Sequence, residues 1–159
     1  MYDYIEINSF IKTSVADGPG VRTVLFLQGC SMKCIGCHNK DAQEKGKGEI
    51  YELYDLIEEI KSICINKKIT ISGGEPMEQY DSLFKLVNEL NKLQFNICLY
   101  TGWNLKDIPK EILKYINYLK VGPFINSVKD SRLAFYGSTN QEFLKINEGV
   151  VECLKMIEV

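Results

Sequence analysis

Short apolar runs alternate along the chain with longer segments in which apolar residues recur every three or four positions. The short runs are rich in β-branched and aromatic residues, and most end at a glycine or a turn sequence, which is typical of strands. The first of them has the pattern of an edge strand. The sequence therefore predicts strands at residues 4–11, 21–27, 68–72, 95–100 and 118–121.

The longer segments have the spacing of amphipathic helices, with one apolar side and one charged side. They cover residues 50–65, 78–93 and 104–116. Pro109 is compatible with the third helix because proline is tolerated in a first helical turn. Beyond residue 124 the alternation weakens. Residues 125–132 allow a short helix, and residues 143–159 fit either strand or helix.

This order of elements predicts an α/β fold. Strand, glycine loop and helix follow one another with short connections, which builds parallel βαβ units with right-handed crossovers. A complete (β/α)₈ barrel needs about 200 residues or more, whereas this chain has 159. We therefore expect one domain over residues 1–159, folded as an open, incomplete (β/α) barrel with mostly parallel strands.

Composition and charge narrow the class of protein. A formal net charge of −2 argues against a nucleic-acid or membrane-surface binder, which usually carries a basic excess. No apolar run approaches the roughly 18 residues that cross a bilayer. The first residues lack the basic and apolar regions of a signal peptide. We therefore expect a cytoplasmic protein whose partners are proteins or small molecules.

The six cysteines indicate metal or redox chemistry more than disulfides, because a cytoplasmic protein keeps its thiols reduced. Cys30, Cys34 and Cys37 have C-x₃-C-x₂-C spacing and follow a predicted strand directly. The other three stand singly among apolar residues and are predicted to be small buried hydrophobes. These are Cys64, Cys98 and Cys153.

Three thiolates at this spacing can surround one small inorganic centre. A structural zinc site usually takes four ligands from two separate C-x₂-C pairs, and the chain has no second pair. His38 is the only histidine, and it adjoins Cys37 too closely for both to reach one tetrahedral ion easily. The triplet favours a [4Fe–4S] cluster with one iron open to a small molecule. A zinc site and purely structural cysteines are the alternatives.

A second candidate site is Ser72-Gly73-Gly74-Glu75-Pro76, which follows another predicted strand. Its glycines allow close approach of the backbone to a ligand, and Glu75 can accept a hydrogen bond from an ammonium group. An ordinary glycine turn is the alternative for this segment alone. Its position one β/α unit after the cysteines favours a ligand site.

Together these two motifs resemble the radical S-adenosylmethionine superfamily. Residues 17–22 before the triplet, and Cys37-His38-Asn39 at its end, are similar to the activating enzymes of glycyl-radical enzymes. Three later segments resemble the subgroup that acts on the anaerobic ribonucleoside-triphosphate reductase. They are Tyr100-Thr-Gly-Trp103, Val121-Gly-Pro-Phe124 and residues 133–141.

The resemblance implies a single radical S-adenosylmethionine domain with oxidoreductase activity. Such an enzyme cleaves S-adenosylmethionine reductively at a [4Fe–4S] cluster and abstracts hydrogen from a glycine of the reductase. The implied partners are the reductase, as protein substrate, and an electron donor of the flavodoxin or ferredoxin type. The alternatives are an activase of another glycyl-radical enzyme, of the pyruvate formate-lyase type, and a non-catalytic iron–sulfur electron carrier.

The resemblance also implies roles for the residues at the motif positions. Cluster and S-adenosylmethionine carry the chemistry, so no further catalytic side chain is implied. The iron ligands are Cys30, Cys34 and Cys37. The cofactor-binding residues are Gly36, Cys37 and His38 beside the adenine, and Gly73, Gly74 and Glu75 around the methionyl ammonium.

Two positions depart from the family pattern. Gly36 stands where relatives often have an aromatic or bulkier residue, so side-chain stacking on the adenine is lost. Val121 stands where relatives often have aspartate, and Lys120 precedes it. Lys120 can serve the carboxylate of the ligand instead, with a solvated lysine as the alternative.

Overall fold

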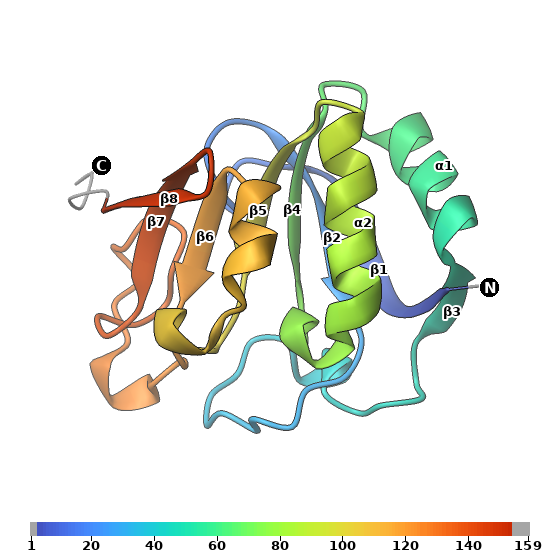
Figure 1. The fold of residues 1–159 in the computed structure, drawn as a ribbon. Helices are drawn as coiled ribbons and strands as arrows, with labels where there is room; N and C mark the ends of the chain where they lie inside the picture. Colours follow the sequence, from blue (N-terminus) through green and yellow to red (C-terminus); the bar gives the residue numbers. More distant parts are fainter. Residues whose placement is uncertain (1–2, 154–159) are drawn as a thin grey trace.

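The computed structural model describes residues 3–153 and shows one eight-stranded sheet with helices against one of its faces (Figure 1). The strands lie in the order β3-β1-β2-β4-β5-β6-β7-β8, and the sheet is open rather than closed into a barrel. They are β1 (Tyr4–Ser14), β2 (Arg22–Leu27), β3 (Glu49–Glu52), β4 (Lys68–Gly73), β5 (Asn96–Tyr100), β6 (Tyr118–Val121), β7 (Glu142–Asn147) and β8 (Val150–Cys153).

The central strands β2, β4, β5 and β6 are parallel, as the alternating sequence predicts. Antiparallel strands extend both sides of this centre: β1 and β3 beyond β2, and β7 and β8 beyond β6. The predicted open α/β fold is therefore confirmed. Within the described part of the chain, no helix is both long and apolar enough to cross a membrane.

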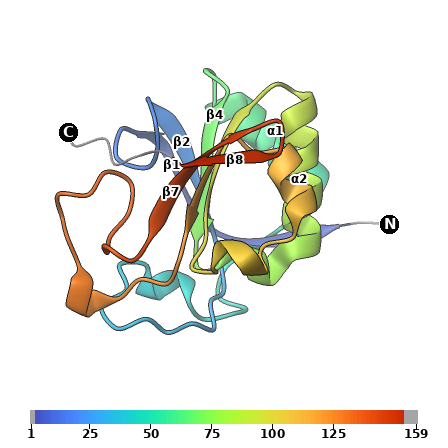
Figure 2. The same cartoon turned by 60° about the vertical axis from the view of Figure 1, so that its left-hand side comes forward.

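Two helices cover one face of the sheet, α1 (Leu53–Ile63) and α2 (Tyr80–Lys92), and Figure 2 shows them on the same side. Between helices and sheet lies the main core, to which each central strand contributes alternate residues. Fully buried examples are Leu25, Ile71, Leu99 and Leu119. The intervening residues point to the opposite face, where they form a smaller cluster around Cys98, Tyr100 and Phe143.

The helix predicted at residues 50–65 is wrong in its first part. Residues Glu49–Glu52 form β3, which pairs with the first half of β1, and the helix begins only at Leu53. In so short a segment, the apolar spacing of a strand cannot be distinguished from that of a helical turn. Pairing with β1 therefore decides that Glu49–Glu52 form a strand.

The helix predicted at residues 104–116 is replaced by two short 3₁₀ helices, η3 (Leu105–Asp107) and η4 (Lys110–Lys114). Pro109 lies between them in an extended conformation (ψ 125°), so it separates two elements instead of starting one. Residues 125–132 contain only the 3₁₀ helix η5 (Asn126–Val128).

Residues 143–159, which fit either strand or helix by sequence, form strands β7 and β8 as far as residue 153. Residues 154–159 lie outside the described residues. Cys64 and Cys98 are buried, at 2% and 0% exposed, as predicted. The prediction that the Cys153 side chain is buried also lies outside the described part of the structure.

Candidate functional site

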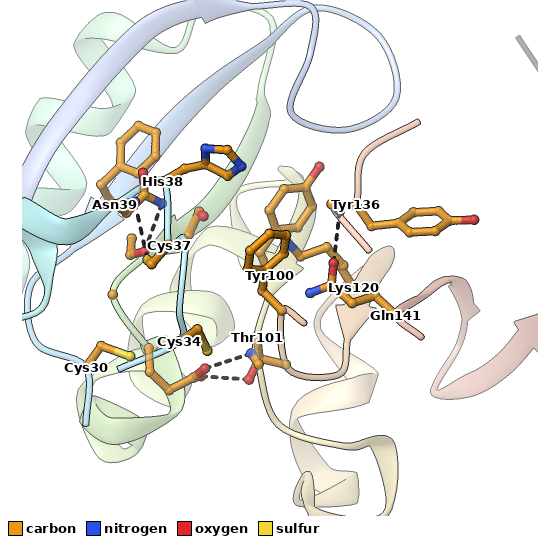
Figure 3. A pocket seen from close by; sticks show the side chains of 18 of the residues that line it. Cys30, Cys34, Cys37, His38, Asn39, Tyr100, Thr101, Lys120, Tyr136 and Gln141 are labelled. Carbon is orange, nitrogen blue, oxygen red and sulfur yellow. Dashed lines mark hydrogen bonds between the residues drawn. The ribbon is translucent and has the colours of Figure 1, made fainter. Parts of the chain in front are cut away.

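A cavity of about 480 Å³ lies on the face of the sheet opposite the helices, at the carboxyl ends of the parallel strands (Figure 3). This is the end of an α/β sheet at which ligands usually bind. The loops after β2, β4, β5 and β6 all contribute to its wall. Its polar and thiol lining includes Asp17, Cys30, Cys34, Cys37, His38, Asn39, Glu75, Thr101, Lys120 and Gln141.

The three cysteines of the triplet are free, partly exposed thiols that line this one cavity. Their loop turns back on itself through a hydrogen bond from the Cys37 N–H to the Cys34 carbonyl (3.2 Å). Burial raises the pKa of the Cys30 thiol, and the carboxylates of Glu75 and Glu78 add to that rise. A cationic metal centre would reverse this effect by favouring the thiolate.

The number of cysteines on the cavity wall fits a [4Fe–4S] cluster better than a structural zinc ion, which usually takes four protein ligands. Among residues 3–152, no three His, Cys, Asp or Glu side chains are grouped so as to hold one metal ion. Zinc needs its sulfurs gathered about 2.3 Å from a single centre. A [4Fe–4S] cluster distributes its thiolates over different irons. Three thiols on one cavity wall, with no further cysteine among its lining residues, suit the second case.

The base of the cysteine loop is fixed by hydrogen bonds to the chain that returns after it. The Gly29 N–H donates to the Ala42 carbonyl (2.6 Å), and the Cys30 N–H donates to the Gln43 carbonyl (2.9 Å). The buried Gln28 amide donates to two more carbonyls of the same segment, those of Asp41 (2.9 Å) and Glu44 (2.7 Å). The base of the cysteine loop is therefore closed by hydrogen bonds within the protein itself.

We expect Gln28→Ala to loosen the base of the cysteine loop. The Asp41 and Glu44 carbonyls lose their donor, so stability should fall by about 1–3 kcal/mol, and the protein should release iron faster to a chelator. Thermal unfolding and the rate of iron release measure the two effects. Asn8→Ala is the control, because the Asn8 amide donates to the side-chain oxygen of Gln28 (2.8 Å) and its own oxygen accepts from the Ser9 hydroxyl (2.7 Å), so Asn8 bonds to neither of the two carbonyls. Equal effects of both substitutions would contradict the role assigned to Gln28.

The two glycines at the end of β4, Gly73 and Gly74, are required by contact with the protein itself. Gly73 has φ +121°, and a Cβ there would collide with backbone atoms of Leu27. A Cβ on Gly74 would collide with the carbonyl of Gly29. Two hydrogen bonds connect these closely packed segments: the Gly74 N–H donates to the Leu27 carbonyl (2.9 Å), and the Glu75 N–H donates to the Gly29 carbonyl (2.8 Å). The glycine loop is thus joined to the start of the cysteine loop.

Glu75 is held as a rigid, buried carboxylate on the cavity wall, 2% exposed. It accepts hydrogen bonds from the Thr101 hydroxyl (2.6 Å), the Gly102 N–H (2.7 Å) and the Met77 N–H (3.0 Å). Burial still raises its pKa, although the three donors act in the opposite direction. An ammonium group entering the cavity would add the positive charge that this carboxylate lacks.

Gly36 is placed differently from the other predicted site residues. It is exposed and does not line the cavity, and a Cβ on it would lie 2.7 Å from the Asn126 amide oxygen. Its contact with adenine stays a prediction. His38 does line the cavity, with its ring 5.7 Å from that of Phe124.

Two features of the site were not predicted from the sequence. The Asn39 amide donates to the Gly73 carbonyl (3.1 Å) and so ties the cysteine loop to the glycine loop. Residues 122–141, between β6 and β7, form one side of the cavity. The Gln141 amide stabilises this loop by donating to the Gly122 carbonyl (2.9 Å) and accepting from the Gly137 N–H (2.9 Å). In the sequence, this loop was indicated only by the family resemblance of Val121-Gly-Pro-Phe124 and residues 133–141.

Comparison with known proteins identifies the family. The 4Fe–4S single cluster domain family matches residues 16–144. A protein of Vibrio cholerae serotype O1, named anaerobic ribonucleoside-triphosphate reductase-activating protein, is 31% identical over 145 residues. The match covers 84% of this chain and 94% of that relative. The chain belongs to this family of activating proteins.

A further member of this family of activating proteins, from Enterobacteria phage T4, is 31% identical over 158 residues, covering 94% of this chain and 96% of the relative. The structure of QueE from Escherichia coli matches with a TM-score of 0.57 at 20% identity, covering 77% of this chain and 61% of that one. This likeness supports the expected α/β fold. The family match confirms the predicted [4Fe–4S] cluster.

Proposed function

We propose that this protein is a radical S-adenosylmethionine activase that generates the glycyl radical of an anaerobic ribonucleoside-triphosphate reductase. The observation that carries the proposal is the convergence of three cysteines and the Glu75 carboxylate on one cavity, in a member of this family. When bound, the cluster supplies the electron that cleaves S-adenosylmethionine to methionine and a 5′-deoxyadenosyl radical, which takes a Cα hydrogen from the glycine.

The protein's part is to hold and orient these groups. Cys30, Cys34 and Cys37 hold three irons, and the fourth is left for the amino acid end of S-adenosylmethionine. Glu75 accepts from the ammonium, beside the backbone of Gly73 and Gly74. The bonds that join the two loops keep the iron ligands and the ammonium site in one fixed relation. Gly36, Cys37 and His38 remain the proposed neighbours of the adenine.

The reactive space is open on one side, which suits a protein substrate. Ile35 on the cysteine loop is 81% exposed, and Ile125 on the 122–141 loop is 41% exposed. These loops touch where Gly36 approaches Asn126, so their apolar residues form an uncovered border near the cavity. A glycine-bearing segment of the reductase would bury this border and exclude water from the radical.

The remaining assignments follow from the family and from the chain's charge. We propose that residues 1–159 act as a single domain and receive electrons from a flavodoxin- or ferredoxin-type donor. A net charge of −2 supports a protein partner rather than nucleic acid or a membrane surface. A cytoplasmic location stays a prediction.

The test is direct detection of the product radical. The protein is reconstituted anaerobically with iron and sulfide, then mixed with S-adenosylmethionine, a reductant and the reductase. We expect the glycyl doublet in electron paramagnetic resonance, with methionine and 5′-deoxyadenosine released. A doublet with pyruvate formate-lyase but not with the reductase would overturn the choice of substrate. An iron–sulfur electron carrier would show reduction of the cluster without either product.

A further inference from the structure

A second cavity, of about 370 Å³, adjoins the main cavity that the three cysteines line. This outer cavity is lined by Met32, Gly102, Trp103, Asn104, Asp107 and Pro123. Met32 and Gly102 line both cavities, so these two residues form the wall between them. The function proposed above leaves the outer cavity without a role.

The wall between the two cavities is thin and carries groups of the site. A Cβ on Gly102 would lie 2.6 Å from the Met32 sulfur and 3.4 Å from a carboxylate oxygen of Glu75. Met32 also stands between Cys30 and Cys34 in the sequence. A protein docked at the outer cavity would therefore touch the segment that carries two of the iron ligands, without entering the main cavity.

The proposed function requires two proteins to reach the same cluster. One is the reductase, whose glycine segment enters the open side of the main cavity, and the other is the electron donor. The electron is needed while S-adenosylmethionine fills the main cavity, because reductive cleavage takes both together. A donor that docks on the outer side of the cysteine loop can supply the electron without displacing the ligand.

Trp103 gives the outer cavity a fixed aromatic surface. Its backbone N–H donates to the Thr101 hydroxyl oxygen (3.0 Å), and its carbonyl accepts from the Gly122 N–H (2.8 Å). The side chain is half-buried and packs against the main core, with Pro123 on the same cavity wall. Tryptophan side chains held in this way are typical anchors of protein interfaces. The flat, partly apolar ring of a flavin fits such a surface better than a compact iron–sulfur cluster does.

The charges beside the outer cavity are mostly positive. Lys33 and Lys106 are exposed and adjoin the lining residues Met32 and Asp107 in the sequence. Within residues 3–152, neither lysine forms an ion pair. The whole loop between β2 and β3, residues 28–48, has four lysines against two acids and a net charge of +2, whereas the chain carries −2. This face therefore complements an acidic protein surface.

We propose that the outer cavity is the docking site of a flavodoxin-type electron donor, an inference that rests on the proposed function. The exposed edge of the flavin packs against Trp103, and acidic residues around the flavin pair with Lys33 and Lys106. One electron passes from the reduced flavin to the oxidised cluster. The anionic flavin hydroquinone is left as the neutral semiquinone, so no proton moves and no bond forms or breaks.

The first test measures binding of the donor without any chemistry. Calorimetry at low salt should show oxidised flavodoxin binding about 5- to 20-fold more weakly to the double variant Lys33→Glu, Lys106→Glu than to the reconstituted wild type. Asp107→Lys removes an acid from the cavity wall and should tighten binding by about 2- to 5-fold. Both differences should shrink as the salt concentration rises. A folding defect cannot produce changes of opposite sign.

Lys12→Glu is the control for charge reversal. Lys12 is exposed and lies on β1 beside the start of β2, whereas the cysteine loop follows the end of β2. The substitution changes the net charge as much as each of the lysine substitutions tested, so it should alter flavodoxin binding by less than about twofold. A loss as large as that of the double variant would show that net charge alone attracts the donor, and would overturn the proposed docking site.

Electron transfer supplies the second readout. Reduced flavodoxin should reduce the cluster more slowly in the double variant than in the wild type. Dithionite needs no docking site, so it should reduce both proteins at the same rate and give the same glycyl doublet. Unchanged flavodoxin binding in the double variant and in Asp107→Lys would overturn the proposal. So would an equal loss of the doublet with dithionite, which would assign these residues to the reductase. A greater loss of binding for ferredoxin than for flavodoxin would overturn the choice of a flavin donor.

These outcomes are distinct from failure of the proposed function. If dithionite-reduced wild type forms the glycyl radical while the double variant binds flavodoxin normally, only the docking site is overturned. If dithionite-reduced wild type releases no methionine and forms no glycyl radical, the activase function is overturned, and with it the donor site that rests on it.

Discussion

Cys34→Ser is expected to abolish the cluster. Cys34 is the middle ligand of the triplet and lines the cavity with Cys30 and Cys37. A serine oxygen is a harder and less readily ionised ligand than a thiolate, and two thiolates cannot hold the cluster alone. After anaerobic reconstitution, iron should fall from about four atoms per chain to a small fraction of that. Visible absorbance and release of methionine from S-adenosylmethionine should fall to background.

Cys64→Ser is the matched control for this prediction. Cys64 is 2% exposed, lies outside the cavity, and its thiol donates to the Lys68 carbonyl (3.2 Å), which a serine hydroxyl can do as well. It should retain the cluster and lose about 1–2 kcal/mol of stability at most. Full iron content in Cys34→Ser, or equal loss in Cys64→Ser, would contradict the assignment of the cluster to the triplet.

The cluster ligands and the central strands were predictable because both are local features. Three cysteines within eight residues leave few alternatives, and each central strand is an apolar run that ends near a glycine. The parallel order of β2, β4, β5 and β6 then follows from the crossover segments that separate them along the chain. The site lies where the loops after these strands meet.

The features that the sequence did not predict depend on contacts between distant residues. Glu49–Glu52 becomes a strand only because β1 offers a partner. Glu75 receives two of its donors from Thr101 and Gly102, on another strand end. Sequence patterns report the residue, but not which groups around it are already paired.

The glycine motif shows this limit most clearly. From the sequence, Gly73 and Gly74 indicate close approach of a ligand to the backbone. In the structure, the space that a side chain would need is filled by the backbone of Leu27 and Gly29. The glycines therefore allow the two loops of the site to pack together, and their contact with a ligand stays a prediction.

Gly73→Ala is accordingly expected to be the most destabilising single substitution in the site. The new Cβ would collide with the Leu27 backbone at a φ of +121°, so stability should fall by about 3–5 kcal/mol and the melting temperature by roughly 6–20 °C. Gly46→Ala is the control, because its φ of +85° carries similar backbone strain but no atom lies within 4 Å of the added Cβ. It should cost about 1–2 kcal/mol. Equal melting temperatures for the two variants would show that backbone strain, and not loop packing, accounts for the glycine at position 73.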